Sequence, residues 1–327
     1  MSLHDDCSLH NREENWQAFL AQQVQPVWQQ YVEEFVVKTQ DNIELHGVTI
    51  HHPQAVRNVV LIPGRVETYK KYQEVCFDLF QQGCNIFSID HRGQGFSQRL
   101  LSDPEKGYVR DFADYAKDLH FALQHTGFIE NKLPTACIAH SMGSAIALNW
   151  IEQYQPQLDK LVLCAPMLGI NAGPLPQSCA LSVASLADFL GRKLFSEVPY
   201  FIGQQPYNRP EFEGNVLSHS RVRFEYVQDM QAQCRLGGVT TSWLYQALKL
   251  IKRLPQIGQQ LSCETLLLQA ENDVVVSLMA QDKWCEQAGK VHDRVNKRIV
   301  KGAKHEILME KDEIRAPIMQ EILYFIR

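Results

Sequence analysis

The sequence predicts an α/β fold, with a mostly parallel central sheet, helices on both faces of the sheet, and an inserted cap. Two observations lead to this prediction. Short apolar runs alternate with amphipathic helical segments over most of the chain, and such alternation is typical of parallel sheets covered by helices. Between residues 167 and 253 the alternation stops, and the segment becomes rich in Pro, Gly, Ser and aromatic residues. We therefore expect residues 1–166 and 254–327 to form one core, with residues 167–253 as the cap.

A hairpin is expected at the start of the sheet, after a polar, Gln-rich lead. Glu34–Gln40 and Ile43–Ile50 alternate between apolar and polar residues, and the Asp41-Asn42 pair between them has the chemistry of a tight turn. The later strands are predicted at Asn58–Ile62, Cys84–Ile89, Thr135–Ala139, Leu161–Ala165, Thr265–Ala270 and Arg298–Val300. Helical spacing of apolar residues predicts helices at Tyr69–Gln82, Asp111–His125, Gly143–Tyr154, Leu181–Leu194, Ser242–Ile251, Leu278–Ala288 and Lys311–Ile326.

Composition and charge argue against several function classes. The chain of 327 residues is 45% hydrophobic and 21% charged, and its net charge of −5 gives no general attraction to nucleic acid. No apolar run is long enough for a spanning helix, and the first residues lack the cationic and apolar parts of a signal peptide. The nine cysteines are scattered without a C-x-x-C pair, which is typical of reduced, buried thiols. We expect a cytoplasmic protein without a metal or cofactor.

The segment Ala139-His140-Ser141-Met142-Gly143 lies between an apolar strand and an apolar helix. A serine nucleophile in this position stands on a sharp turn, and small residues two places before and after it let strand and helix approach closely. Alanine replaces the first glycine of the usual pattern here and is still small. A serine that only caps the helix is the structural alternative.

A serine hydroxyl needs an imidazole base that is oriented by a carboxylate. In a strand–turn–helix elbow of this kind the chain order is serine, acid, histidine, which Ser141, Asp273 and His305 satisfy. Asp273 and His305 each follow a predicted strand. Glu271 and Glu306 compete with Asp273 for the role of the acid. We expect His140 to pack beside the elbow, because it is too close to Ser141 along the chain to act as its base.

The oxyanion of an acyl-transfer reaction needs two backbone N–H donors. One is expected from Met142, at the start of the helix after the nucleophile. The other is expected from Arg65 in the loop Pro63-Gly64-Arg65-Val66-Glu67, where Gly64 allows the backbone to turn.

With these motifs the chain resembles the monoacylglycerol-lipase-like branch of the α/β-hydrolase fold, and within it the bacterial lysophospholipases associated with the inner membrane. The matching segments are Pro63–Arg65, Asp90–Ser97, Gly107–Val109 with Asp111-Phe112, Ala139–Gly143, the Asp273 loop and Lys301–Glu306. The elbow and the Ser–Asp–His order are shared by many hydrolases. The likeness to lysophospholipases lies in Pro63–Glu67, Gly237–Thr240 and Lys301–Glu306. The resemblance implies hydrolysis of a lipid ester through an acyl-serine.

The predicted cap contains a cluster of large apolar side chains between Phe189 and Ile202. An acyl chain needs an apolar tunnel, because each buried CH₂ contributes about 0.8 kcal/mol. The candidate substrate-binding residues are Phe189, Phe195, Tyr200 and Phe201. The alternative is that the cluster forms the cap's own core. Basic residues of the cap are candidates for a phosphate head group, and an exposed apolar cap would suit peripheral contact with a membrane.

Two other functions stay open at this point. A peptidase that removes an N-terminal proline would share the elbow and the cap, and would need acids such as Glu197, Glu211 or Glu213 to hold a free amine. A non-catalytic ligand-binding protein on the same scaffold usually lacks one member of the Ser–Asp–His set, whereas this chain has all three.

Overall fold

The computed structural model describes residues 9–171 and 177–327 and has one eight-stranded sheet with the strand order β1-β2-β4-β3-β5-β6-β7-β8. The strands are β1 (Val32–Lys38), β2 (Glu44–Ile50), β3 (Arg57–Ile62), β4 (Cys84–Ile89), β5 (Thr135–His140), β6 (Lys160–Cys164), β7 (Glu264–Ala270) and β8 (Val295–Val300). Only the β1–β2 and β2–β4 pairs are antiparallel, so the predicted hairpin and mostly parallel sheet are confirmed.

The central strands are buried on both faces, because every residue of β3, β4 and β5 is buried. Parallel strands covered on both sides need such continuous apolar runs. The register pairs Ile62 at the end of β3 with Ala139 near the end of β5. The loop after β3 therefore begins beside the turn that carries Ser141.

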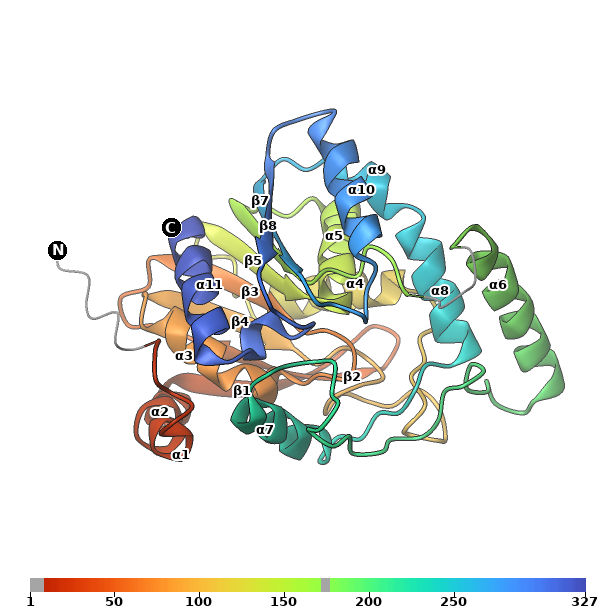
Figure 1. Cartoon of the computed structure of the whole chain (residues 1–327), viewed down its shortest axis with the longest axis horizontal. Helices are drawn as coiled ribbons and strands as arrows, with labels where there is room; N and C mark the ends of the chain where they lie inside the picture. The colour runs from red at the N-terminus through yellow and green to blue at the C-terminus, as the bar shows by residue number, and fades with distance from the viewer. Residues whose placement is uncertain (1–8, 172–176) are drawn as a thin grey trace.

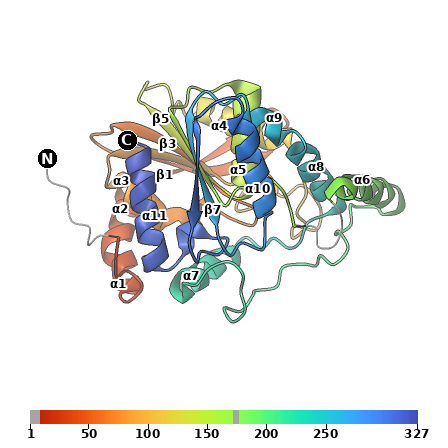
Figure 2. The ribbon, with the colours of Figure 1, turned by 45° about the horizontal axis from the view of Figure 1, so that its top comes forward.

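Helices cover the two faces of the sheet in separate groups (Figures 1 and 2). One apolar cluster joins the sheet to α3 and α11, and the other joins it to α4, α5, α8, α9 and α10. The helices of the core are α3 (Gln73–Phe80), α4 (Ala113–His125), α5 (Met142–Tyr154), α9 (Leu254–Gly258), α10 (Leu278–Gly289) and α11 (Asp312–Phe325), with 3₁₀ turns η3 (Tyr69–Tyr72) and η4 (Ile307–Met309). The helix expected at Tyr69–Gln82 thus starts as a 3₁₀ turn.

The polar lead at the N-terminus is helical, which the sequence did not predict. It forms α1 (Trp16–Phe19), a π-helical turn η2 (Leu20–Val24) and α2 (Gln25–Tyr31). Trp16, Phe19, Leu20 and Val24 pack in a small cluster with Phe77 of α3. The many glutamines lie between these apolar residues and hide the helical period.

The segment between β6 and β7 contains α6 (Gln177–Leu194), α7 (Arg221–Gln231) and α8 (Thr241–Ile251) before α9. In Figure 1 helix α6 lies outermost, beyond α8, whereas α7 lies well away from α6, at the bottom of the view. The sequence did not predict α7. The described helices include none that is long and apolar enough to span a membrane.

Candidate active site

Ser141 lies on a strained turn between β5 and α5. Its backbone has φ +51° and ψ −117°, a conformation that side-chain-bearing residues rarely adopt and that is typical of a nucleophile elbow. A Cβ on Gly143 would lie 2.5 Å from the carbonyl oxygen of Pro63, so only glycine fits there. The hydroxyl of Ser141 makes no capping hydrogen bond to α5. The alternative that Ser141 serves as a helix cap is therefore wrong.

The structure brings Ser141, His305 and Asp273 into one hydrogen-bonded chain. His305 Nε2 lies 2.9 Å from Ser141 Oγ, and His305 Nδ1 lies 2.7 Å from Asp273 Oδ2. An ionised carboxylate only accepts hydrogen bonds, so Nδ1 carries the proton and Nε2 is free to accept the serine proton. All three residues are buried. Asp273 is held in turn by the backbone N–H groups of Val275 and Val276, which donate to Oδ1.

The two competing acids are engaged elsewhere. Glu271 accepts a hydrogen bond from the backbone of Gly302 and lies partly exposed near Lys301. Glu306 pairs with the buried ammonium of Lys71. Neither carboxylate is hydrogen-bonded to His305 Nδ1, because the partner of this nitrogen is Asp273.

The loop Pro63–Glu67 is tied down at several points beside the elbow. His91 bonds the carbonyl oxygen of Pro63 (3.0 Å), and the Gln94 side chain donates to that of Gly64 (2.8 Å). The carboxylate of Glu67 accepts the N–H of Gly64. Arg65 lines the same cavity as Ser141, and Met142 is the first residue of α5. Their roles as oxyanion donors stay a prediction.

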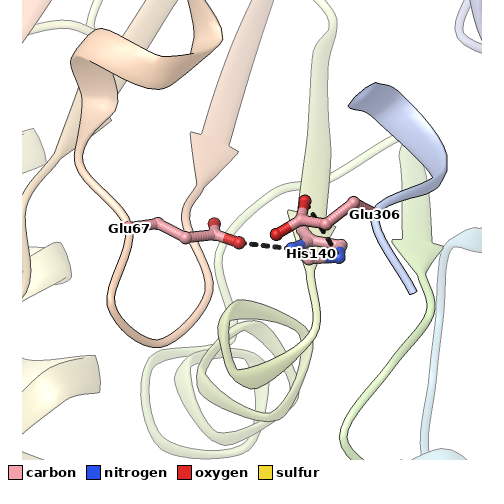
Figure 3. A group of neighbouring side chains, drawn as sticks. All are labelled: Glu67, His140 and Glu306. Carbon is pink, nitrogen blue, oxygen red and sulfur yellow. Dashed lines mark hydrogen bonds and ion pairs between the residues drawn. The ribbon is translucent and has the colours of Figure 1, made fainter. Parts of the chain in front are cut away.

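A buried ionic cluster lies behind the elbow and consists of Glu67, Lys71, His140 and Glu306. Figure 3 shows Glu67, His140 and Glu306 of this cluster. His140 Nδ1 is 2.7 Å from Glu67 Oε1, and His140 Nε2 is 3.1 Å from the carbonyl oxygen of His305. Both partners are acceptors, so both ring nitrogens carry protons and His140 is an imidazolium. Burial alone would lower the pKa of His140, but the carboxylates of Glu67 and Glu306 raise it above its usual value.

Glu67, His140 and Glu306 have ligand atoms within 4.8 Å of one another, as a metal site would. The ammonium of Lys71 already lies between the two carboxylates, 2.8 Å from Glu67 Oε1 and hydrogen-bonded to Glu306. Lys71 thus supplies the positive charge that a metal ion would bring. The cluster links the loop after β3, the end of β5 and the residue after His305, and we infer that it fixes their relative positions.

Ser141 and His305 open into a cavity of about 500 Å³. Its walls come from the loop after β3, the segment 203–210, helix α7 and the segment 236–238. Many of these residues are polar, among them Gln204, Gln205, Asn208, Gln228 and Gln231.

The four predicted substrate-binding residues lie elsewhere among the described residues, because none of them lines this cavity. Phe189 and Phe195 are 61% and 58% exposed, at α6 and just after it. Tyr200 and Phe201 are half-buried. Helix α6 turns Ala180 and Ala184 inward with Leu181 partly buried, and most of its other large apolar residues are exposed. The substrate role of these four residues stays a prediction.

Sequence reasoning missed Glu67, Lys71 and Gln228. The charged pair at Glu67 and Lys71 has the spacing of one helical turn, which usually marks a solvated surface. Nothing local indicates that both side chains are buried. Gln228 belongs to α7, a helix rich in charged residues whose buried face the sequence does not reveal.

The fold and the Ser–His–Asp geometry define an α/β-hydrolase of the serine type. A family model described as serine aminopeptidase, S33, matches residues 53–312. The chain is 35% identical to lysophospholipase L2 of Escherichia coli over 87% of this chain and 84% of that protein. It is 26% identical to the monoglyceride lipase of Homo sapiens over 79% of this chain and 78% of that one. A solved monoglyceride lipase from Saccharomyces cerevisiae has the same fold, with a TM-score of 0.72 at 15% identity, covering 92% and 96% of the two chains.

The chain belongs to the serine aminopeptidase S33 family of hydrolases. Its curated relatives are carboxylic ester hydrolases by name, and this chain is one as well. The peptidase and binding-protein alternatives are not favoured. Two of the three acids considered for a free amine are already paired, Glu197 with Lys106 and Glu213 with Arg221.

Proposed function

We propose that this enzyme hydrolyses the acyl ester of lysophospholipids or monoacylglycerols through an acyl-serine intermediate. The observation that carries the proposal is the hydrogen-bonded chain from Ser141 through His305 to Asp273, at the end of a cavity. The substrate class is supported by the relatives named lysophospholipase L2 and monoglyceride lipase. The substrate would be a small, lipid-like ester.

In the first half-reaction Ser141 Oγ attacks the ester carbonyl carbon while its proton passes to His305 Nε2. Asp273 keeps Nδ1–H oriented and stabilises the imidazolium that forms. The carbonyl oxygen becomes an oxyanion, which the N–H groups of Arg65 and Met142 would hold. The C–O bond to the head group then breaks, and His305 returns its proton to the departing alkoxide oxygen.

In the second half-reaction water attacks the acyl-serine. His305 takes a proton from the water, and the tetrahedral intermediate collapses to free fatty acid. The proton moves to Ser141 Oγ as the ester bond to the enzyme breaks, which restores the starting state. Neither half-reaction needs a group beyond the protein and water.

We also propose that residues 167–253 act as the cap and that residues 1–166 and 254–327 form the core. Helix α7 of this segment supplies part of the cavity wall, together with residues 203–210. The cap would thus enclose the substrate above Ser141.

The outer face of α6 is proposed as a surface for peripheral contact with lipid at the cytoplasmic side of a membrane. Exposed large apolar side chains gather on it, including Leu186, Phe189, Leu190 and Leu194, of which Leu194 is 70% exposed. Arg192 and Lys193 lie on the last turn of the same helix. Apolar residues beside cations favour the headgroup region of a bilayer.

A hydrolysis panel tests the proposed function. It compares lysophospholipids, monoacylglycerols, short p-nitrophenyl esters and prolyl peptides under the same conditions. We expect the highest kcat/KM on a long-chain glycerol ester and no turnover of the peptides. Preferential cleavage of the peptides, or esterase activity confined to the short esters, would contradict the proposal.

A further inference from the structure

The cavity that holds Ser141 and His305 contains a polar side chain without a hydrogen-bond partner. Gln228 of α7 is 0% exposed and lines this cavity. Within the part of the chain that the structure describes, neither its Oε1 nor its Nε2 has a partner. Buried amides are nearly always hydrogen-bonded, because burying one unpaired costs free energy. The amide of Gln228 is therefore positioned for a partner inside the cavity.

Helix α7 is fixed to the core close to Gln228. The guanidinium of Arg223 donates two hydrogen bonds to Glu74, at 2.7 and 2.9 Å, and one to Asp312 at 2.6 Å. Arg223 is fully buried and also donates to the carbonyl oxygen of Glu310. Charge-assisted bonds of this kind hold the helix in place. The helix that carries Gln228 is thus held in place beside the cavity.

Two more cavity-wall residues have unused donors. The Nε of Arg65 and the hydroxyl of Tyr207 are buried and have no partner among the described residues. Arg65 donates to the carbonyl oxygen of Gly237 and forms no ion pair with a described carboxylate. Burial lowers the pKa of its guanidinium to about 10. By contrast, the cap arginines Arg209 and Arg221 are neutralised by neighbouring acids.

We infer that Gln228, Tyr207 and Arg65 form a subsite for the oxygen-rich head of the ester substrate. Nε2 of Gln228 donates to a phosphate or hydroxyl oxygen, and Oε1 accepts from a glycerol hydroxyl. The uncompensated charge of Arg65 favours an anionic head group. A glycerol or glycerophosphate head supplies both acceptor oxygens and hydroxyl donors. The inference rests on the proposed function and assigns the polar end of its substrate to residues 65, 207 and 228.

The test compares wild type with Gln228→Met, which keeps the length of the side chain and removes its amide. The matched control is Gln233→Met, because Gln233 is exposed just beyond the end of α7. The substrates are a lysophospholipid and a monoacylglycerol with the same acyl chain, and p-nitrophenyl butyrate, which has no glycerol head. Thermal unfolding of each variant is measured without substrate.

We expect Gln228→Met to lower kcat/KM about tenfold on the glycerol esters, the effect of one lost hydrogen bond. Hydrolysis of p-nitrophenyl butyrate should change less than about twofold, and Tm should not fall, because an unpaired buried amide has been removed. A loss on both glycerol esters would assign Gln228 to the glycerol hydroxyls, and a loss on the lysophospholipid alone to the phosphate. Equal losses on all three esters, or no loss on either glycerol ester, would overturn the inference.

A measurement on wild type alone covers the case in which Gln228→Met fails to fold. Glycerol 3-phosphate should inhibit hydrolysis of p-nitrophenyl butyrate competitively, because it fills the subsite next to Ser141. Absence of inhibition up to high millimolar concentration would overturn the inference. If wild type cleaves p-nitrophenyl butyrate but neither glycerol ester, the proposed function itself fails. If wild type cleaves all three esters and Gln228→Met does so with the same kcat/KM as wild type, only the subsite fails.

Discussion

Glu67→Gln tests the buried cluster behind the elbow most strongly. Glu67 is 2% exposed and accepts hydrogen bonds from Gly64 N–H, Lys71 Nζ (2.8 Å), Tyr72 Oη (2.5 Å) and His140 Nδ1 (2.7 Å). Glutamine has one acceptor oxygen, and its NH₂ group would face two of these donors. The change also leaves Lys71 and His140 with Glu306 as their only carboxylate partner among the described residues.

Removing one partner of a buried ion pair typically costs about 3–5 kcal/mol, and we expect a loss of this size in the free energy of unfolding. Gly64 N–H also loses its acceptor, so the loop that carries Arg65 is less well fixed. Loss of one oxyanion donor lowers kcat by about 10²–10³, which sets the upper limit of the effect on activity. Urea unfolding and kcat on p-nitrophenyl butyrate measure the two effects.

The matched control is Glu271→Gln. The carboxylate of Glu271 is partly exposed and lies 3.7 Å from Lys301, and exposed pairs contribute about 0–1 kcal/mol. We expect this control to unfold near the urea concentration of wild type. If Glu67→Gln did the same and kept the wild-type kcat, the cluster would have no positioning role and our reasoning would be refuted.

Three further predictions concern the acid, the pH dependence and the lipid surface. Asp273→Asn should lower kcat by about 10⁴, whereas Glu271→Gln should have little effect, and the reverse result would make Glu271 the acid. The pKa of His140 is raised in the folded protein. The stabilisation that the charged imidazole provides is therefore complete below about pH 6.5, the usual imidazole pKa, and is lost as the pH rises through the higher pKa of the folded state. The difference in unfolding free energy between wild type and His140→Gln should therefore shrink at higher pH, and a difference that grows with pH would contradict the imidazolium assignment. Phe189→Ser should reduce co-sedimentation with anionic lipid vesicles, while Val291→Ser, at a similarly exposed site away from α6, should not; equal binding by both variants and wild type would argue against the α6 surface.

The strands and the arrangement around Ser141 were predictable because their determinants are local. Short apolar runs such as Asn58–Ile62, which ends before Pro63-Gly64, are typical of buried strands in a sheet covered on both faces. The small residue Gly143 is required by the turn itself. Chain order then leaves few candidates for the acid and the base. The contacts of Asp273 and His305 follow from the parallel pairing of β7 and β8.

The buried charged residues and the orientation of the cap helices could not be predicted, because they depend on tertiary contacts that no local sequence pattern indicates. Lys71 is buried only because carboxylates from two distant segments, at Glu67 and Glu306, surround it. Arg223 looks like a surface residue until Glu74 and Asp312 are brought to it by folding. The orientation of α6 also depends on tertiary contacts, because Ala180 and Ala184 lie inward and Phe189 is left exposed.

Active-site labelling with a fluorophosphonate, followed by mass spectrometry of the labelled peptide, tests the central claim most directly. Wild type should carry one label, on Ser141, and lose its esterase activity in proportion to the labelled fraction. Ser141→Ala should stay unlabelled and inactive while unfolding at the same urea concentration as wild type. A label on another residue, or esterase activity that survives in Ser141→Ala, would contradict the assignment of Ser141 as the nucleophile.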